Sequence, residues 1–225
     1  MELAENARKH NLKIIVLRNY EGLPKINKGN DIDIIINKKD LSKWVKILEV
    51  IALNNQLKFK KIKKYSYCLK TVVEGVEDKN NKLELDLNYD LNWRGVEFIK
   101  TVEVEERADI EVENIIFTAP LSIAYFVTLC HSFLYGGHIK SKYAISLDVI
   151  RKSDNLLSDF MNRMNFVFGE DNAKKLLAMH ENNNPQQNKK QIRSIRVAVL
   201  LKGFRRNPLK FVIGFIKSYL YDVFG

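Results

Sequence analysis

The seven residues Asp31–Asn37 (DIDIIIN) constrain the fold of this chain more than any other feature. Successive side chains of a β-strand point to opposite faces, so this alternation places two carboxylates, Asp31 and Asp33, on one face. The other face carries three isoleucines, Ile32, Ile34 and Ile36. A strand with one apolar face belongs in a sheet that packs on a hydrophobic core. We therefore predict a sheet in which this strand holds two acidic side chains next to each other.

A pair of carboxylates on one face of a buried strand is costly, because both groups lose water and repel each other. A divalent cation removes that cost, and Mg²⁺ prefers carboxylate oxygens together with substrate phosphates. We therefore predict that Asp31 and Asp33 bind Mg²⁺, with Mn²⁺ as an alternative ion. A pair that is simply solvated at the edge of the strand is the other interpretation.

The segment Lys82–Asn88 (KLELDLN) repeats the alternation and supplies a third acidic residue. Asp86 is the predicted third metal ligand, and Glu84, on the same face, is the alternative. Three carboxylates can hold two metal ions, one that activates an attacking oxygen and one that binds a triphosphate and its leaving pyrophosphate. Asp86 is then also the candidate general base for an acceptor hydroxyl. A lysine or arginine ion-paired at this point, or an Asp86 side chain that faces away from the other two, would count against the enzyme interpretation.

The remaining patterns predict an α+β architecture, a mixed sheet with flanking helices followed by a helical C-terminal half. Besides the two acidic segments, strands are predicted at residues 13–17, 57–64, 65–73, 101–106 and 114–118. Helices are predicted at residues 1–10, 41–53, 121–135, 139–151, 154–166 and 171–180. The polar run ENNNPQQNKK is predicted to be a linker at residues 181–190. The expected domains are an α/β domain, a helical domain, and a linker with a basic amphipathic tail, at residues 1–118, 119–182 and 183–225.

The net charge of +10 is concentrated near the C-terminal end. Residues 189–225 contain nine lysines and arginines against one acid, Asp222, whereas residues 1–188 contain 28 basic and 26 acidic residues. A protein whose main partner is a long nucleic acid more often carries basic residues across its working face. Nucleic acid is therefore not the expected partner.

Three further features of the sequence favour a cytoplasmic protein. Cys68 and Cys130 match no metal or redox spacing and are predicted to be buried thiols in a reducing compartment. Residues 1–11 lack the apolar core of a signal peptide. A run of about 18 uncharged apolar residues, which a spanning helix needs, does not occur.

Three segments resemble the nucleotidyltransferase-family proteins encoded in bacterial and archaeal surface-polysaccharide clusters: VLRNYEGLP (16–24), GNDIDIII (29–36) and LDLNYDLNWRG (85–95). The order of strands and helices around them is similar to the polymerase-beta-like nucleotidyltransferase fold. The resemblance covers residues 12–150. It implies Mg²⁺-dependent transfer of a nucleotidyl or related phosphoryl group from a nucleoside triphosphate or another phosphorylated donor. The implied acceptor is a hydroxyl of a glycan or lipid-linked molecule in surface-polysaccharide synthesis.

The chain departs from that superfamily where Gly-Ser opens a helix that cradles the triphosphate. Arg18 and Asn19 stand in that register, and a bidentate contact from Arg18 to phosphate is the predicted replacement. The substitution equally fits a different phosphorylated donor, lost nucleotide binding, or an ordinary surface arginine. Asn30, Arg94 and Lys142 complete the predicted nucleotide- and substrate-binding residues.

The C-terminal tail has an apolar stripe at helical spacing, formed by Leu209, Val212, Ile213, Ile216, Leu220 and Val223. Basic residues precede the stripe, namely Arg193, Arg196, Lys202, Arg205 and Arg206. Basic residues beside an apolar helical face are typical of a helix on anionic lipid. We therefore predict that residues 189–225 hold the protein peripherally on the cytoplasmic membrane. Packing on its own domain or on a second copy of the chain is the main alternative.

Three functions stay open at this point. The first is the Mg²⁺-dependent nucleotidyltransferase described above. The second is a non-catalytic, membrane-docked binding module of the same fold, which the missing Gly-Ser supports. The third is a toxin–antitoxin-type nucleotidyltransferase that modifies RNA or protein, although such proteins are usually shorter and need no tail that seeks lipid.

Overall fold

The computed structural model describes six stretches of the chain, residues 2–18, 31–78, 82–112, 116–136, 144–182 and 185–224. The chain forms two compact units. Unit 1 comprises residues 1–91, 99–120 and 220–225, and unit 2 comprises residues 92–98 and 121–219. In the described stretches no helix is both long and apolar enough to cross a membrane.

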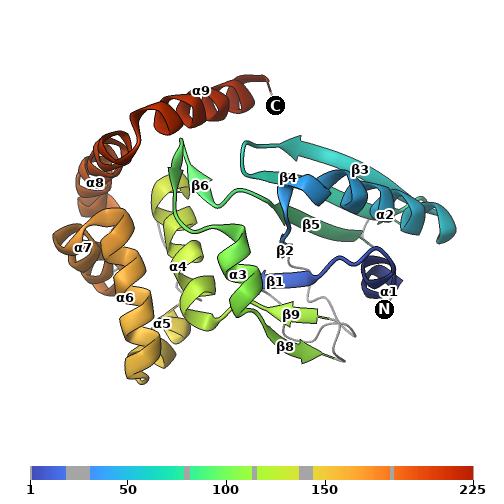
Figure 1. Ribbon diagram of the computed structural model, residues 1–225, viewed down its shortest axis with the longest axis horizontal. Helices are drawn as coiled ribbons and strands as arrows, with labels where there is room; N and C mark the ends of the chain where they lie inside the picture. Colours follow the sequence, from blue (N-terminus) through green and yellow to red (C-terminus); the bar gives the residue numbers. More distant parts are fainter. Residues whose placement is uncertain are drawn as a thin grey trace. The chain divides into compact units, whose positions relative to one another are not determined.

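Unit 1 is built around a seven-stranded mixed sheet with the order β3-β4-β5-β2-β1-β9-β8 (Figure 1). Its strands are β1 (Ile14–Arg18), β2 (Ile32–Ile35), β3 (Leu57–Lys64), β4 (Cys68–Gly75), β5 (Lys82–Asn88), β8 (Asp109–Val112) and β9 (Ile116–Thr118). Strand β2 runs parallel to β5, and β1 runs parallel to β9. The other neighbours are antiparallel. The predicted mixed sheet is confirmed.

Helices pack on one face of this sheet, and the apolar side chains between the helices and the strands form the core of unit 1 (Figure 1). The helical elements of the unit are α1 (Glu2–Lys9), the 3₁₀ turn η1 (Lys38–Asp40), α2 (Leu41–Asn54) and α3 (Thr101–Arg107). In α2, Trp44, Leu48 and Ala52 recur every fourth residue and are buried. They pack in one cluster with the sheet residues Ile32, Ile34, Ile36, Leu85 and Leu87. The acidic residues of β2 and β5 alternate with these side chains and therefore face the other way.

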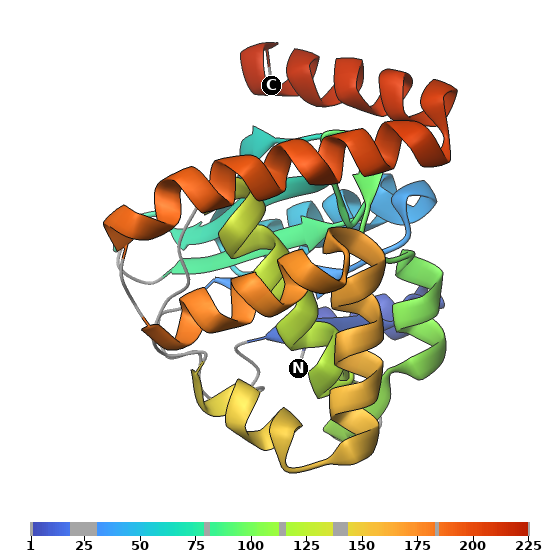
Figure 2. The same ribbon diagram turned by 90° about the vertical axis from the view of Figure 1, so that its left-hand side faces the viewer.

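In its described residues, unit 2 is helical apart from a short hairpin of β6 (Asn92–Trp93) and β7 (Val96–Glu97). Its helices are α4 (Leu121–His131), the π-helical turn η2 (Ser132–Gly136), α5 (Ala144–Arg151), α6 (Asp154–Phe168), α7 (Glu170–Asn182), α8 (Pro185–Arg206) and most of α9 (Pro208–Phe224). Every residue of α4 from Ser122 to Cys130 is buried, as expected for a helix that is apolar on all sides. Helices α5 and α6 pack against α4 (Figure 2). The predicted helical C-terminal half is confirmed.

The segment 101–106, predicted as a strand, is helix α3 instead. Val102 and Val104 alternate with polar residues, which mimics a strand, but only Val104 is buried, at 0% exposure, while Val102 is 47% exposed. In a helix, residues two positions apart point to nearly opposite sides. The abundant glutamates of the segment also favour a helix over a strand.

The run 181–190, predicted as a linker, is mostly helical. Helix α7 continues to Asn182, and α8 begins at Pro185. Proline suits the first turn of a helix, where its missing N–H has no intrahelical partner to lose, and the following glutamines and lysines are good helix formers. The predicted strand 65–73 also shifts, to Cys68–Gly75, because Tyr65 closes a turn by donating its N–H to the Cys68 carbonyl at 2.7 Å.

A matched pair of substitutions tests the helix at Thr101–Arg107. Val104→Ser is expected to lower the free energy of unfolding by about 2–3 kcal/mol, because it removes buried apolar surface and buries a hydroxyl. Val102→Ser is the control and should change it by less than about 0.5 kcal/mol, since this side chain is already exposed. Urea denaturation measures both. Equal losses would place both valines on one buried face, as in a strand.

Candidate functional site

Asp33 and Asp86 are direct neighbours on adjacent strands. They are register partners in the parallel pairing of β2 with β5. Both side chains lie on the sheet face opposite the α1–α2 core, and both are buried, at 2% and 8% exposure. The structure thus brings two of the three predicted acidic ligands together in a nearly dry position.

Asp31 lies just before β2 and is half-buried. Its charge acts on Asp86 and on Lys70 of β4, so it lies within electrostatic reach of both. In the part of the chain that the structure describes, however, no three histidine, cysteine or acidic side chains converge closely enough to hold a metal ion. The predicted three-carboxylate centre is therefore not preformed.

A lysine contacts the acidic pair. Lys70 is the register partner of Asp86 in the antiparallel pairing of β4 with β5, and its Nζ lies 2.9 Å from Asp86 Oδ2. Burial lowers the pKa of Lys70, but the hydrogen bond to Asp86 and the charges of Asp86 and Asp31 raise that pKa by more. Lys70 is therefore a firmly protonated cation at the position predicted for a metal. This ion pair is the arrangement that counts against the enzyme interpretation.

The pKa of Asp86 is raised above its ordinary value. Burial is the largest cause, and the charges of Asp33 and Asp31 raise the pKa further, while the hydrogen bond and the charge of Lys70 oppose the shift. The buried carboxylates therefore repel each other in the way that the sequence predicts, and one lysine relieves only part of the cost. A carboxylate with a raised pKa is also a better proton acceptor than an exposed one.

Asn88 and Tyr67 complete the surroundings of the acidic pair. The Asn88 side-chain amide donates to Asp33 Oδ1 at 3.3 Å and to the Asp86 carbonyl at 3.0 Å, which fixes the Asp33 carboxylate. Burial raises the pKa of Tyr67, and the nearby negative charges, including that of Asp86, raise it further. Tyr67 thus stays a neutral phenol.

Sequence reasoning did not assign a role to Lys70, Tyr67 or Asn88. Asn88 had a visible signal, since it shares one face with Asp86 along the strand. Lys70 and Tyr67 had none, because their place beside Asp86 depends on the register of β4 against β5, which the sequence pattern does not set. The alternative ligand, Glu84, is paired with Lys82 and is more exposed than Asp86.

The other predicted binding residues are less informative. Arg18 ends β1, and its backbone pairs with Asp33. Asn19, Asn30 and Lys142 lie outside the described residues. Arg94 is exposed at the tip of the β6–β7 hairpin, in unit 2, with its guanidinium over the Trp93 ring.

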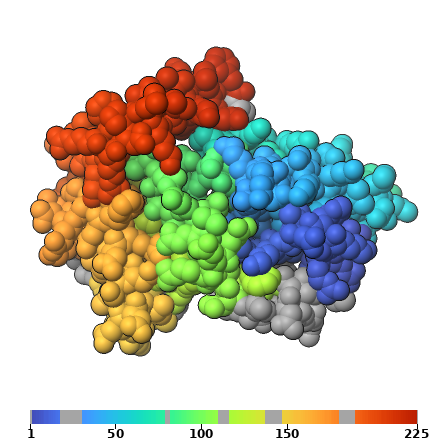
Figure 3. All heavy atoms as spheres, viewed as in Figure 1, coloured from blue at the N-terminus to red at the C-terminus, as the bar shows by residue number. Residues whose placement is uncertain are grey.

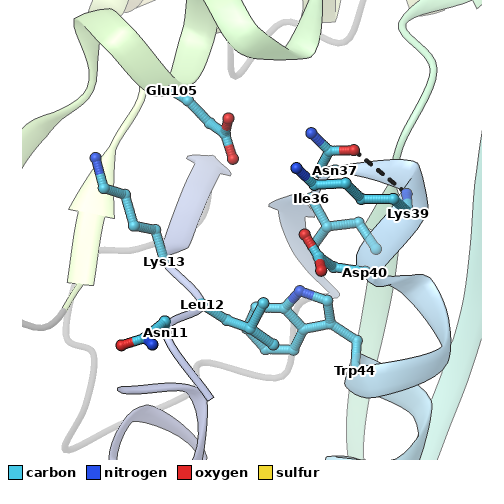
Figure 4. Close-up of a pocket in the computed structure, with 9 residues that line it drawn as sticks. All are labelled: Asn11, Leu12, Lys13, Ile36, Asn37, Lys39, Asp40, Trp44 and Glu105. Atoms are coloured by element: carbon cyan, nitrogen blue, oxygen red, sulfur yellow. Dashed lines mark hydrogen bonds between the residues drawn. The ribbon is translucent and has the colours of Figure 1, made fainter. Parts of the chain in front are cut away.

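A polar cavity of about 230 Å³ lies elsewhere in unit 1 (Figure 4). It is lined by Asn11, Leu12, Lys13, Ile36, Asn37, Lys39, Asp40, Trp44 and Glu105. Two of the lining residues, Ile36 and Asn37, come directly after β2 in the chain, whereas Asp31 comes directly before it. The cavity therefore lies toward the opposite end of β2 from Asp31 and includes none of the predicted site residues.

No known protein-family model and no curated protein matches this sequence. Among solved structures, the protein JHP933 from Helicobacter pylori is similar, with a TM-score of 0.40 and 12% sequence identity. The similarity covers 96% of this chain and 93% of that one.

The raised pKa of Asp86 predicts a pH dependence of stability. The folded protein holds the Asp86 proton at pH values where the unfolded chain, with an ordinary pKa of 3.8, has lost it. This carboxyl therefore makes the free energy of unfolding fall as the pH rises from about 4 toward neutrality. Asp86→Asn should remove that decline, so its stability relative to the parent protein increases with pH.

Urea denaturation in the presence of EDTA, between about pH 4 and about pH 7, measures this effect. Glu84→Gln is the control, because this residue lies on the same strand face and is more exposed. A stability difference between Asp86→Asn and the parent that is constant across this range would contradict the raised pKa.

Proposed function

We propose that this chain is a nucleotidyltransferase-fold enzyme that transfers a nucleotidyl or related phosphoryl group to a hydroxyl acceptor. The observation that carries the proposal is the register of Asp33 with Asp86, which places two buried carboxylates side by side with the charge of Asp31 nearby. These residues belong to the two segments, GNDIDIII and LDLNYDLNWRG, that resemble the nucleotidyltransferase family. A glycan or lipid-linked acceptor in surface-polysaccharide synthesis rests on that resemblance alone.

Mg²⁺ is the proposed cofactor, with Mn²⁺ as an alternative. Asp31, Asp33 and Asp86 are the residues that would hold it. When bound, the ion would neutralise the donor phosphates and lower the pKa of an attacking hydroxyl. The residues do not converge in the form described here, and Lys70 occupies one oxygen of Asp86. The proposal therefore requires that the site rearrange on binding.

The protein's own side chains suit this chemistry. Lys70 is long and partly exposed, so its ammonium can exchange the Asp86 carboxylate for a phosphate oxygen of the donor. Asp86, with its raised pKa, can accept the proton of an acceptor hydroxyl. Asn88 holds Asp33 in one orientation.

A non-catalytic binding module of the same fold is the second candidate. The ion pair of Lys70 with Asp86 favours it, because an internal cation can serve as the permanent counterion of a carboxylate pair. Such a module would keep the fold and bind a phosphorylated ligand without metal. No observation favours the third possibility, a toxin–antitoxin enzyme.

Calorimetry with nucleoside triphosphates distinguishes the two candidates. The parent protein is expected to bind a nucleoside triphosphate with Mg²⁺ and not with EDTA. Asp33→Asn should weaken Mg²⁺-dependent binding by about tenfold or more, because the charge of the ligands sets the affinity for the cation. Glu84→Gln is the matched control and should bind normally. Binding that is equal with Mg²⁺ and EDTA, and unchanged in Asp33→Asn, would support the module instead.

Lys70→Met tests whether Mg²⁺ can take the place of the Lys70 ammonium beside Asp86. Removing the ammonium leaves Asp86 without this ion pair, so the free energy of unfolding should fall by about 1–3 kcal/mol in EDTA. Mg²⁺ should restore part of this loss, and should raise the melting temperature of Lys70→Met more than that of the parent protein. Thermal denaturation with and without Mg²⁺ measures both effects. If Mg²⁺ stabilises neither protein, the metal-dependent enzyme is excluded.

A further inference from the structure

Helix α9 turns its apolar stripe toward the outside. Leu209 is 72% exposed and Ile216 is 52% exposed, and the stripe between them is exposed as well. Ser218, on the opposite side of the helix, is only 4% exposed and is the buried residue of α9. An amphipathic helix that serves only to close a core shows the reverse arrangement. The alternative that the stripe packs on its own domain is therefore wrong for residues 209–216.

Two glycines fix this rotation of the helix. Gly95 lies in the tight turn of the β6–β7 hairpin with φ +82°, beside Arg94 with φ 48°. A Cβ atom on Gly214 would lie 2.5 Å from the Gly95 Cα, so α9 and the hairpin touch backbone to backbone. Lys210 adds an ion pair to Glu97 of the same hairpin at 2.9 Å. A branched side chain of the apolar stripe does not fit at this contact, so the stripe stays outside.

Helix α8 extends the exposed apolar surface. Val197, Leu201 and Phe204 follow one another at helical spacing and are exposed. At the turn between the helices, the Phe204 ring meets the Phe211 ring edge to face, with centroids 5.9 Å apart. In Figure 3 the orange-red and red atoms of α8 and α9 adjoin one another. The exposed apolar side chains of the two helices are together called the outer face of α8 and α9, namely Val197, Leu201, Phe204, Leu209, Val212, Ile213, Ile216 and Tyr219.

Three basic residues of the tail do not belong to this face. Arg196 donates to the Phe133 carbonyl at 2.9 and 2.7 Å, and Lys202 donates to the Asn165 carbonyl at 2.9 Å. Arg206 donates to the Phe166 carbonyl and lies over the Phe166 ring. Arg196, Lys202 and Arg206, which are predicted from the sequence as charges beside the apolar stripe, thus also attach α8 to η2 and α6. The exposed basic residues of the tail are Lys189, Lys190, Arg193, Arg205, Arg206, Lys210 and Lys217, of which Arg206 and Lys210 are held by the contacts described above.

We propose that the outer face of α8 and α9 binds the surface of an anionic lipid bilayer. The face is apolar and the same helices carry exposed basic side chains, with Asp222 the one acid of residues 189–225. Apolar side chains enter the acyl boundary while basic side chains meet lipid phosphates. A second copy of the chain fits less well, because a symmetric contact would bring the basic side chains of the two copies together. This inference does not depend on the proposed reaction.

Vesicle flotation of the full chain tests the proposal. Binding is expected to vesicles of phosphatidylcholine with phosphatidylglycerol, and not to vesicles of phosphatidylcholine alone. Replacing both Arg205 and Lys217 by Gln should weaken partitioning about twenty-five-fold, about fivefold for each charge lost. Replacing both Ile213 and Ile216 by Ser should weaken it by about tenfold for each side chain.

Leu53→Ser is the matched control, because Leu53, like Ile213 and Ile216, is an exposed aliphatic side chain on a helix, but it lies on α2 of unit 1. It should bind vesicles as the parent protein does, and circular dichroism should be the same for all variants. Absence of binding to the anionic vesicles would overturn the proposal. The proposal would also be overturned if the protein did not bind vesicles and light scattering instead detected a stable dimer that the Ile213 and Ile216 substitutions dissociate. Equal binding to both kinds of vesicle would exclude the role of the basic side chains.

Discussion

The burial of Asp33 beside Asp86 is the constraint on which the acidic site depends. The two carboxylates are register partners on parallel strands, so their separation is set by the sheet and not by side-chain choice. Their repulsion and lost hydration act against folding, as the raised pKa of Asp86 records. A cation must therefore lie nearby whatever the protein does. Lys70 fills that requirement in the structure, and Mg²⁺ is proposed to share it during function.

The alternation of polar and apolar residues predicted the faces of Asp33 and Asp86 correctly, because period two leaves only one assignment once a core exists. Hence Ile32, Ile34 and Ile36 pack with α2, and Asp33 lies on the other face. The same rule failed at Val102 and Val104, where a short alternation belongs to a helix that buries only one valine. Short alternating segments without aromatic or turn residues carry too little information to separate the two structures.

The partner of Asp86 could not be predicted, since Lys70 reaches it only through the register of β4 with β5, in a hairpin whose connection spans residues 76–81. A shift of two residues would preserve every face and put another side chain opposite Asp86. The contact of Gly95 with Gly214 was equally hidden, because it joins residues 119 positions apart in the chain. Sequence patterns specify faces, whereas the neighbours across faces come from packing.

The acidic pair and the outer face of α8 and α9 break the usual rules of burial in opposite ways, one by burying charge and the other by exposing apolar side chains. Each is held by rigid neighbours, the paired strands β2 and β5 in the first case and the glycine contact in the second. Arrangements that cost folding free energy and are held in place tend to mark functional sites. A cation beside the acidic pair and lipid against the outer face would each reduce the free-energy cost of these arrangements.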